Sequence, residues 1–241
     1  FFDSGNARNA ALYHLARMAP STGLDIGLQN RGTYAWTEFG LFAGIAASYY
    51  RDGALRAALD ARSGMLAGHY GCYILGVHTY RPGPELPAAE PVSLTGATRV
   101  PLQAADYRRM QRGDRGAPRT ALPYDQTFDL ATLRGGFGPG DACLLLSGWS
   151  GGGNLPANAI VTLSASGDTW LAHTAQDRTF DQNALFIRRL SAPALEAPAV
   201  PGAARLDAMG RTPAASFLAA TLPGYAGADW TRRIVWLPDI G

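Results

Sequence analysis

The sequence contains no lysine, because every one of its 21 basic residues is arginine. Schiff-base catalysis and the lysine-dependent phosphate loop of nucleotide-binding proteins are therefore excluded. Only four histidines and two cysteines are present. Cys72 and Cys143 lack the spacing of a zinc site. They either form one disulfide in an oxidising compartment or remain two isolated buried thiols, and the sequence leaves both alternatives open.

The sequence also lacks any apolar run long enough to cross a bilayer as a helix. Its 241 residues are 47% hydrophobic and 17% charged, which is typical of a soluble globular protein of one large or two small domains. A formal net charge of +2 gives no indication of a nucleic-acid groove, so no nucleic-acid partner is predicted.

The two ends of the sequence lack the usual terminal signals. The chain begins at Phe1 without a start methionine or signal peptide, and its last strand-like segment lies close to the final residue. We therefore expect a fragment of a longer protein.

The N-terminal third of the chain has a helical period of apolar residues. Helices are predicted over 6–19 and 37–50, and Asp52 is placed to cap a third helix that ends at Gly64. Residues 81–125 are rich in Pro, Gly and Ala and are predicted to form a surface connection. Within them, 98–102 is strand-like and 105–110 is typical of a helical turn.

From residue 127 onward the pattern changes to short strands separated by turns. The predicted strands are 127–134, 142–148, 158–164, 169–173, 184–189, 216–222 and 229–237, with turns at 138–141 and 166–168. Helices first and strands afterwards predict an α+β fold with an antiparallel β-sandwich. The predicted domains are a helical part with a junction segment, 1–92, and a sandwich, 93–241.

Gly148-Trp149-Ser150-Gly151-Gly152 matches G-x-S-x-G, the turn that carries the nucleophile of α/β-hydrolases. That motif requires a helix after the serine, whereas the residues after it here alternate like a strand. The acid and base that should follow, Asp168 and His173, lie too close for the intervening parallel strands and helices. A glycine connection between two strands is the favoured interpretation, and a serine hydrolase using Ser150 is a lesser alternative.

The segment 69–80, HYGCYILGVHTY, concentrates groups that can transfer protons. It holds two of the four histidines and lies where helices give way to strands. His69, Tyr73 and His78 are the candidate catalytic residues. The alternative is an aromatic junction that packs the two parts of the chain together.

Several runs of sequence resemble the heparinase II/III-like polysaccharide lyases. They are FDLATLRGGFGPGDACLLLSG at 128–148, the glycines 151–153, the triplet 158–160, GDTWL at 167–171 and GADWTR at 227–232. The resemblance implies the C-terminal β-sandwich of that family, with residues 1–64 as the last helices of its incomplete α/α toroid. It further implies β-elimination of an acidic, uronate-containing polysaccharide, and a periplasmic or secreted location.

The chain departs from that family where its functional residues should lie. After the glycines such lyases carry a His-x-His-x-Asp-x-Asn-type run, of which only Asn158 matches here. The later Asp and His positions fall near His173 and Gln182. A structural divalent metal is typical of the family, but its ligands are missing, so no cofactor is predicted. His173 is the one candidate metal ligand, and a lone histidine among aspartates is more often solvated.

The candidate substrate-binding residues are Arg31, Tyr34 and Trp36 in one loop, together with Asn154 and Asn158. Aromatic rings can stack on sugar faces and an arginine can bind a carboxylate. The alternative for the loop is packing by its own aromatics. Two hypotheses follow: an enzyme that eliminates at a uronate, or a relative that binds polysaccharide, or only scaffolds, without catalysis.

Overall fold

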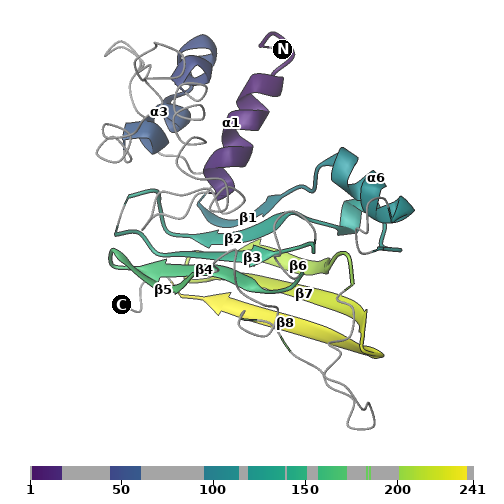
Figure 1. Cartoon of the computed structure of the whole chain (residues 1–241). Helices are drawn as coiled ribbons and strands as arrows, with labels where there is room; N and C mark the ends of the chain where they lie inside the picture. The colour runs from purple at the N-terminus through teal and green to yellow at the C-terminus, as the bar shows by residue number, and fades with distance from the viewer. Residues whose placement is uncertain are drawn as a thin grey trace. The chain divides into compact units, whose positions relative to one another are not determined.

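The computed structural model describes residues 2–17, 44–60, 95–113, 119–138, 140–150, 157–172, 183, 185 and 201–237. These residues form a β-rich α+β fold (Figure 1). Its helical elements are α1 (Asn6–Arg17), α3 (Gly53–Asp60), α6 (Ala104–Arg112) and the 3-10 turn η4 (Tyr124–Gln126). Its strands are β1 (Gly96–Val100), β2 (Leu130–Arg134), β3 (Cys143–Ser147), β4 (Ile160–Ala165), β5 (Asp168–Ala172), β6 (Arg205–Arg211), β7 (Ser216–Tyr225) and β8 (Ala228–Trp236).

The chain divides into two compact units that are not contiguous in sequence. Unit 1 comprises Phe1–Gly96, Arg134–Cys143 and Ser164–Trp170, and unit 2 comprises Ala97–Leu133, Leu144–Leu163 and Leu171–Gly241. The predicted boundary between residues 92 and 93 lies outside the described residues and stays a prediction.

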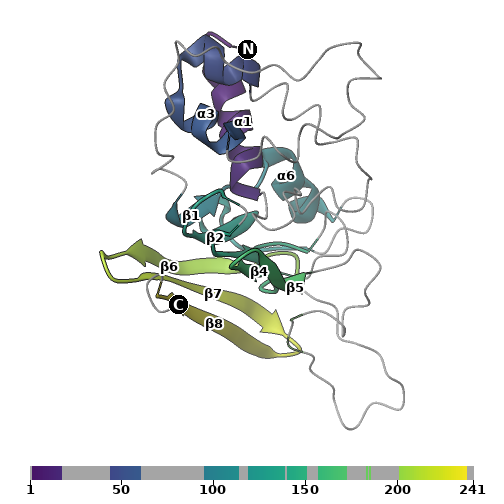
Figure 2. The same cartoon turned by 90° about the vertical axis from the view of Figure 1, so that its left-hand side faces the viewer.

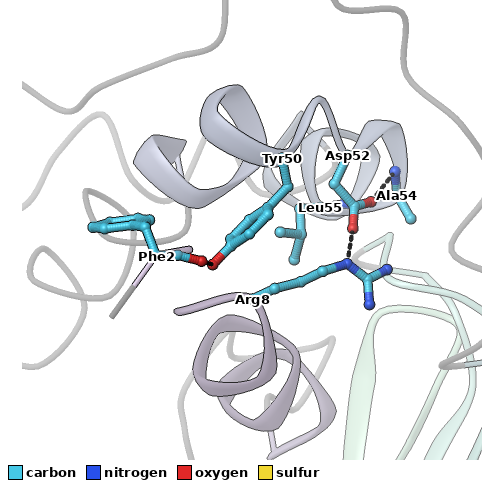
Figure 3. Close-up of polar contacts among 6 residues, drawn as sticks. All are labelled: Phe2, Arg8, Tyr50, Asp52, Ala54 and Leu55. Atoms are coloured by element: carbon cyan, nitrogen blue, oxygen red, sulfur yellow. Dashed lines mark hydrogen bonds and ion pairs between the residues drawn. The ribbon is translucent and has the colours of Figure 1, made fainter. Parts of the chain in front are cut away.

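In unit 1, the predicted cap of the third helix is confirmed. One carboxylate oxygen of Asp52 accepts hydrogen bonds from the backbone N–H groups of Ala54 and Leu55, at 3.0 and 3.2 Å (Figure 3). Two of the N–H groups that a helix leaves unpaired at its start are thereby satisfied. The other oxygen lies 2.6 Å from Nε of Arg8 on α1, so one side chain starts α3 and ties it to α1.

A second contact joins the start of the chain to the helical residues 44–50. The Tyr50 hydroxyl donates to the Phe2 carbonyl oxygen, and the Tyr49 hydroxyl donates to Asp3 (Figure 3 shows the first of these). The rings of Phe2 and Tyr49 lie 5.1 Å apart, and those of Tyr49 and Tyr50 meet edge to face at the same distance. Whether these helices end an α/α toroid stays a prediction.

The first sheet has five strands in the order β1-β2-β3-β4-β5, so each strand neighbours the next one in the chain. Bonds across the connections, Gly135 N–H to Ala142 O at 2.8 Å and Ser147 N–H to Ala159 O at 2.8 Å, are those of antiparallel neighbours. The predicted turn between β4 and β5 is confirmed: Ser166 and Gly167 both have positive φ, 55° and 85°, as a two-residue hairpin turn requires.

The second sheet contains β6, β7 and β8 in that order, all antiparallel. Ala226 and Gly227, with φ of 55° and 85°, form a similar two-residue turn between β7 and β8. Strand β6 is the element that the sequence analysis missed. Its residues RLDAMGR lack β-branched and aromatic side chains, and a register shift between Leu206 and Ala208 interrupts the alternation.

Both sheets contribute to one apolar core within unit 2, in the arrangement of a β-sandwich. Alternate residues of β2, β3 and β7 supply its centre; they are Ala131, Leu133, Leu144, Leu146, Leu218, Ala220 and Leu222. Each leucine buried there stabilises the fold by about 1.5–3 kcal/mol relative to an exposed one. Figures 1 and 2 show the strand arrangement from two sides.

The other predicted elements in the described residues are also confirmed, with small differences at their ends. The strand-like piece near residue 98 is β1, the helical turn near residue 105 is α6, and the turn at 138–141 is closed by a bond from Asp141 N–H to Gly138 O. The strand predicted over 184–189 lies outside the described residues, except for Leu185.

Candidate functional site

The segment Ser147–Ser150, which leads into the glycine connection between β3 and β4, is held by backbone bonds on both sides. Gly148 N–H donates to Asp129 O at 2.8 Å, and Gly148 O accepts from Ala204 N–H at 2.7 Å. A Cβ placed on Gly148 would lie 2.1 Å from the Phe128 carbonyl oxygen, so no larger residue fits without moving the backbone. Because Gly148 has no side chain, its segment can lie close to the backbone of both Phe128–Asp129 and Ala204.

Trp149 anchors the same segment through its indole ring. Its Nε1–H donates to a carboxylate oxygen of Asp129 at 2.7 Å, and Asp129 is buried. A charged acceptor strengthens such a bond and satisfies the buried carboxylate. The aspartate therefore holds the start of the connection rather than facing solvent.

Ser150 is also buried, and its hydroxyl is engaged twice. It donates to the Pro201 carbonyl oxygen at 3.1 Å and accepts from Ala157 N–H at 2.8 Å. Its own backbone N–H donates to Gly202 O at 2.9 Å. Residues 150 and 157 stand at the two ends of the connection 151–156, so the Ser150 hydroxyl closes that connection.

These surroundings do not suit a nucleophile. The residues described after the connection, 157–165, lead into strand β4 and not into the helix that a nucleophile elbow requires. The Ser150 proton is donated to a carbonyl group, whereas an activated serine donates to a base. The geometry favours the glycine connection over the hydrolase alternative.

Asn158 is the one predicted site residue within the described part of the chain. It is fully buried and has a left-handed backbone conformation with φ of 65°, which asparagine tolerates better than most residues. Its side-chain amide donates to the Trp230 carbonyl oxygen at 3.0 Å, and its backbone N–H donates to Ser147 O at 2.7 Å. A side chain with no exposed surface that links β8 to the β3–β4 connection serves the sandwich itself.

Arg232 completes this link from the β8 side. Its Nε–H donates to the Asn158 carbonyl oxygen at 3.1 Å, and a terminal nitrogen donates to Asn183 O at 3.0 Å. The guanidinium lies 5.0 Å from the centre of the Trp230 ring, within range of a cation–π contact. Burial lowers the pKa of Arg232, but an arginine remains charged at any physiological pH.

A fully buried arginine lies in unit 1. Arg134, at the end of β2, donates from a terminal nitrogen to the Ala16 carbonyl oxygen at 3.2 Å, in the last turn of α1. Its guanidinium also stacks 4.6 Å from the centre of the Phe137 ring. Burial lowers the pKa of Arg134. A cation at the C-terminal end of a helix is stabilised by the helix dipole, which accounts for this placement.

The structure also exposes a surface that the sequence analysis did not single out, namely the outer face of the β6-β7-β8 sheet. Phe217 and Val235 lie opposite each other on β7 and β8 and are 40% and 69% exposed. Arg233 lies opposite Ala219 in the next pair on the same face. The alternation of apolar residues in β7 could have predicted this exposed face. Leu218, Ala220 and Leu222 face the core, so Phe217, which precedes them by an odd number of residues, must face outward.

The remaining predicted site residues lie outside the described residues. They are His69, Tyr73 and His78 as proton-transfer candidates, Arg31, Tyr34, Trp36 and Asn154 as substrate contacts, and His173 as the metal candidate. Cys143 is buried in β3, and Cys72 lies outside the described part. Among the residues that the structure does describe, no group of three His, Cys, Asp or Glu side chains is arranged to hold a metal ion.

Comparison with known proteins adds no family assignment: no protein-family model matches the chain, and no curated protein matches it. The resemblance to polysaccharide lyases is therefore carried by the quoted residues alone. None of the helices in the described ranges is both long enough and apolar enough to span a membrane.

Proposed function

We propose that this chain is the helical end and β-sandwich of a heparinase II/III-like, carbohydrate-active protein that binds an acidic polysaccharide without cleaving it. The observation that carries the proposal is the hydrogen bonding of the residues that flank the β3–β4 connection. Ser150 and Asn158 flank that connection, and the Ser150 hydroxyl and the Asn158 side-chain nitrogen are both hydrogen-bonded to backbone groups of the sandwich. The lyase-type run would place histidines and a carboxylate here.

The sequence of the connection supports the same conclusion. Between Ser150 and Asn158 the chain offers three glycines, then Asn154, Leu155, Pro156 and Ala157, with no group that could take a proton from a sugar carbon. A protein that keeps the sandwich but lacks a base at this position retains a surface for the polymer. It loses the removal of a proton from the sugar carbon at this position.

Elimination at a uronate is the second candidate, and the resemblance of residues 128–171 to the lyases favours it. In that case the base and acid come from His69, Tyr73 or His78. The periplasm or the exterior of the cell, where such polymers occur, is the proposed location in both cases. The partner in both cases is an acidic polysaccharide, with no nucleic acid involved.

One experiment separates these functions. The chain is incubated with polygalacturonate and with alginate, while binding is measured by affinity electrophoresis and elimination by the ultraviolet absorbance of an unsaturated uronate. Binding without absorbance supports the proposal. Absorbance that is lost in both His69→Ala and His78→Ala establishes elimination instead, and the absence of both binding and absorbance overturns both functions.

A further inference from the structure

Helix α6 has three arginines among its nine residues, and two of them lie on its outward side. Met110 faces the core and is fully buried, whereas Arg108 and Arg112 are exposed. Because these two arginines are four residues apart, they are neighbours on one face of the helix. The third, Arg109, pairs with Asp106 at 3.1 Å. Asp106 is two residues before Arg108, so the one carboxylate of the helix does not share a face with it.

A fourth arginine lies at the C-terminal end of α6. The helix is capped by Gly113, whose N–H donates to the Met110 carbonyl oxygen at 3.3 Å. A Cβ placed on Gly113 would lie 2.7 Å from Nε of Arg119, so the exposed Arg119 side chain lies against this glycine. A cation there is stabilised by the negative end of the helix dipole. Arg119 therefore adds a positive charge beside the last turn of the helix.

The backbone of Arg119 joins this end of α6 to the start of the glycine connection between β3 and β4. Its carbonyl oxygen accepts from Gly202 N–H at 3.1 Å, and the Gly202 carbonyl oxygen accepts from Ser150 N–H at 2.9 Å. Trp149, next to Ser150, packs against the same small apolar cluster as Met110 of α6. The arginines of α6 therefore lie on the part of unit 2 that holds the start of this connection.

An exposed tyrosine lies on the flank of α6. The Tyr124 ring is 42% exposed, and it is held by an edge-to-face contact with Tyr107 at 5.1 Å and by a bond from its hydroxyl to Leu102 O at 2.6 Å. Gln111 donates to the Tyr107 hydroxyl at 3.1 Å. Gln111 is also three residues after Arg108, so the two are neighbours on the helix surface. One continuous surface therefore leads from an aromatic ring to the arginines.

The segment that forms this surface is positively charged. Residues 104–126 contain five arginines against three aspartates, a formal charge of +2. Within the described residues of this segment, the carboxylates are Asp106, which pairs with Arg109, and Asp125, which is exposed on η4. The outward face of α6, namely Arg108, Gln111 and Arg112, carries cations and no carboxylate.

From these contacts we infer that the outward face of α6 binds the acidic polysaccharide, with Arg108 and Arg112 on carboxylates and Tyr124 under a sugar ring. This inference rests on the proposed function and specifies its binding surface. A guanidinium binds a carboxylate through two parallel hydrogen bonds, and the apolar C–H face of a sugar packs on an aromatic ring. Exposed cations along a convex helix suit an extended polyanion better than a small ligand, which needs a concave pocket.

The probe is polygalacturonate, and its fully methyl-esterified form is the control, since it has the same backbone without the charge. Dextran sulfate serves as a polyanion that has no carboxylates. Dissociation constants are measured for the full chain at low salt and at physiological salt. We expect polygalacturonate to bind, and both other polymers to bind about tenfold more weakly. Binding of polygalacturonate should also weaken as salt rises, because exposed charges are screened.

The first variant combines Arg108→Gln with Arg112→Gln. Loss of both charges should weaken binding of polygalacturonate by about tenfold at low salt, since each exposed ion pair contributes modestly. The matched control combines Arg211→Gln with Arg233→Gln, which removes two exposed charges from β6 and β8 and should leave binding unchanged. All four side chains belong to exposed residues, so both variants should fold, and far-ultraviolet circular dichroism checks this.

A second pair of variants tests the aromatic ring. Tyr124→Phe keeps the ring and should bind like the parent chain, whereas Tyr124→Ala removes it and should weaken binding roughly fivefold. Both lose the hydroxyl bond to Leu102 O, so their comparison isolates the ring. If Tyr124→Ala does not fold, the arginine variants still test the surface.

The outcomes separate this inference from the proposed function. If the parent chain binds polygalacturonate and the arginine double variant binds it equally well, the inferred surface is wrong while the function survives. If the parent chain binds no uronate polymer, the function fails and the inference fails with it. If dextran sulfate binds as tightly as polygalacturonate, and the double variant weakens both equally, the face attracts any polyanion and the inferred recognition of uronates is overturned.

Discussion

At the scale of single residues, the connection between β3 and β4 depends on Gly148, which has no side chain, and on Asn158, whose side chain is buried. Gly148 lets the backbone that follows β3 lie against Phe128, and Asn158 holds a backbone conformation that most residues avoid. Both demands come from the close approach of chain segments within unit 2. Each of these two demands can be tested by substituting the residue concerned.

Gly148→Ala should be strongly destabilising. The added methyl group would lie 2.1 Å from a backbone oxygen, and backbone cannot move aside as cheaply as a flexible side chain. We expect a loss of about 2–4 kcal/mol in the free energy of unfolding, measured by urea denaturation. Gly140→Ala is the matched control, because a Cβ there meets nothing within 4 Å, and it should change stability by less than about 0.5 kcal/mol. Equal effects of the two substitutions would contradict the packing of Gly148.

Asn158→Ala and Asn158→Gly separate the two roles of this residue. Both remove the hydrogen bond to Trp230 O, which should cost about 1–3 kcal/mol because a buried acceptor is left unpaired. Only alanine also suffers the strain of φ near 65°. We therefore expect the alanine variant to be the less stable by roughly 1 kcal/mol in urea denaturation. A glycine variant no more stable than the alanine variant would show that the backbone there is not left-handed.

At the scale of elements, the caps decide where helices begin and end. Asp52 begins α3 and Arg134 lies at the end of α1, although Arg134 is 118 residues away from Ala16 in the sequence. The first contact is local and follows from the sequence, since an aspartate before a helical pattern is a common start signal. The second depends on a strand far along the chain.

Asp52→Asn and Asp52→Ala distinguish the cap from the ion pair. Asparagine keeps an oxygen for the N–H groups of Ala54 and Leu55 but loses the charge that faces Arg8. The Arg8 side chain is 42% exposed, so we expect a loss below about 1 kcal/mol for asparagine. Alanine also loses the cap, for a further loss of about 1 kcal/mol. Thermal unfolding followed by circular dichroism measures both, and identical midpoints for the two variants would argue against the cap.

At the scale of the whole molecule, each of the two compact units is built from three separate segments of the chain. The chain passes from one unit to the other at 96/97, 133/134, 143/144, 163/164 and 170/171. Several of these crossings fall inside strands of the five-stranded sheet. A strand cannot lose half of its hydrogen bonds without disturbing the other half, so the chain should unfold as one unit.

Urea unfolding should therefore give one transition by two probes. Four of the five tryptophans, Trp149, Trp170, Trp230 and Trp236, lie among the strands, so fluorescence reports mainly on the sheets, while ellipticity at helical wavelengths reports mainly on the helices. We expect the two midpoints to coincide within error. Midpoints that clearly differ would show that the helices of unit 1 unfold independently of the sheets.

The sequence by itself determined the order of the described elements apart from β6, the α+β class, the Asp52 cap and the turns at 138–141 and 166–168. These features depend on neighbours within a few residues: the period of apolar side chains, a capping carboxylate, and Gly or Ser where φ must be positive. It also favoured a glycine connection between two strands over a nucleophile turn at Ser150, because the residues after Ser150 alternate like a strand.

Only the tertiary structure decided what each polar group contacts. Asn158 matched a lyase motif in sequence, yet its side chain is buried against Trp230, 72 residues further on. Strand β6 was missed because its weak pattern becomes a strand only by pairing with β7. The exposed row of Phe217, Arg233 and Val235 arises from the register of β7 and β8 together with the burial of their other faces. Local patterns fix elements, whereas burial and pairing between distant segments decide which side chains remain available to a ligand.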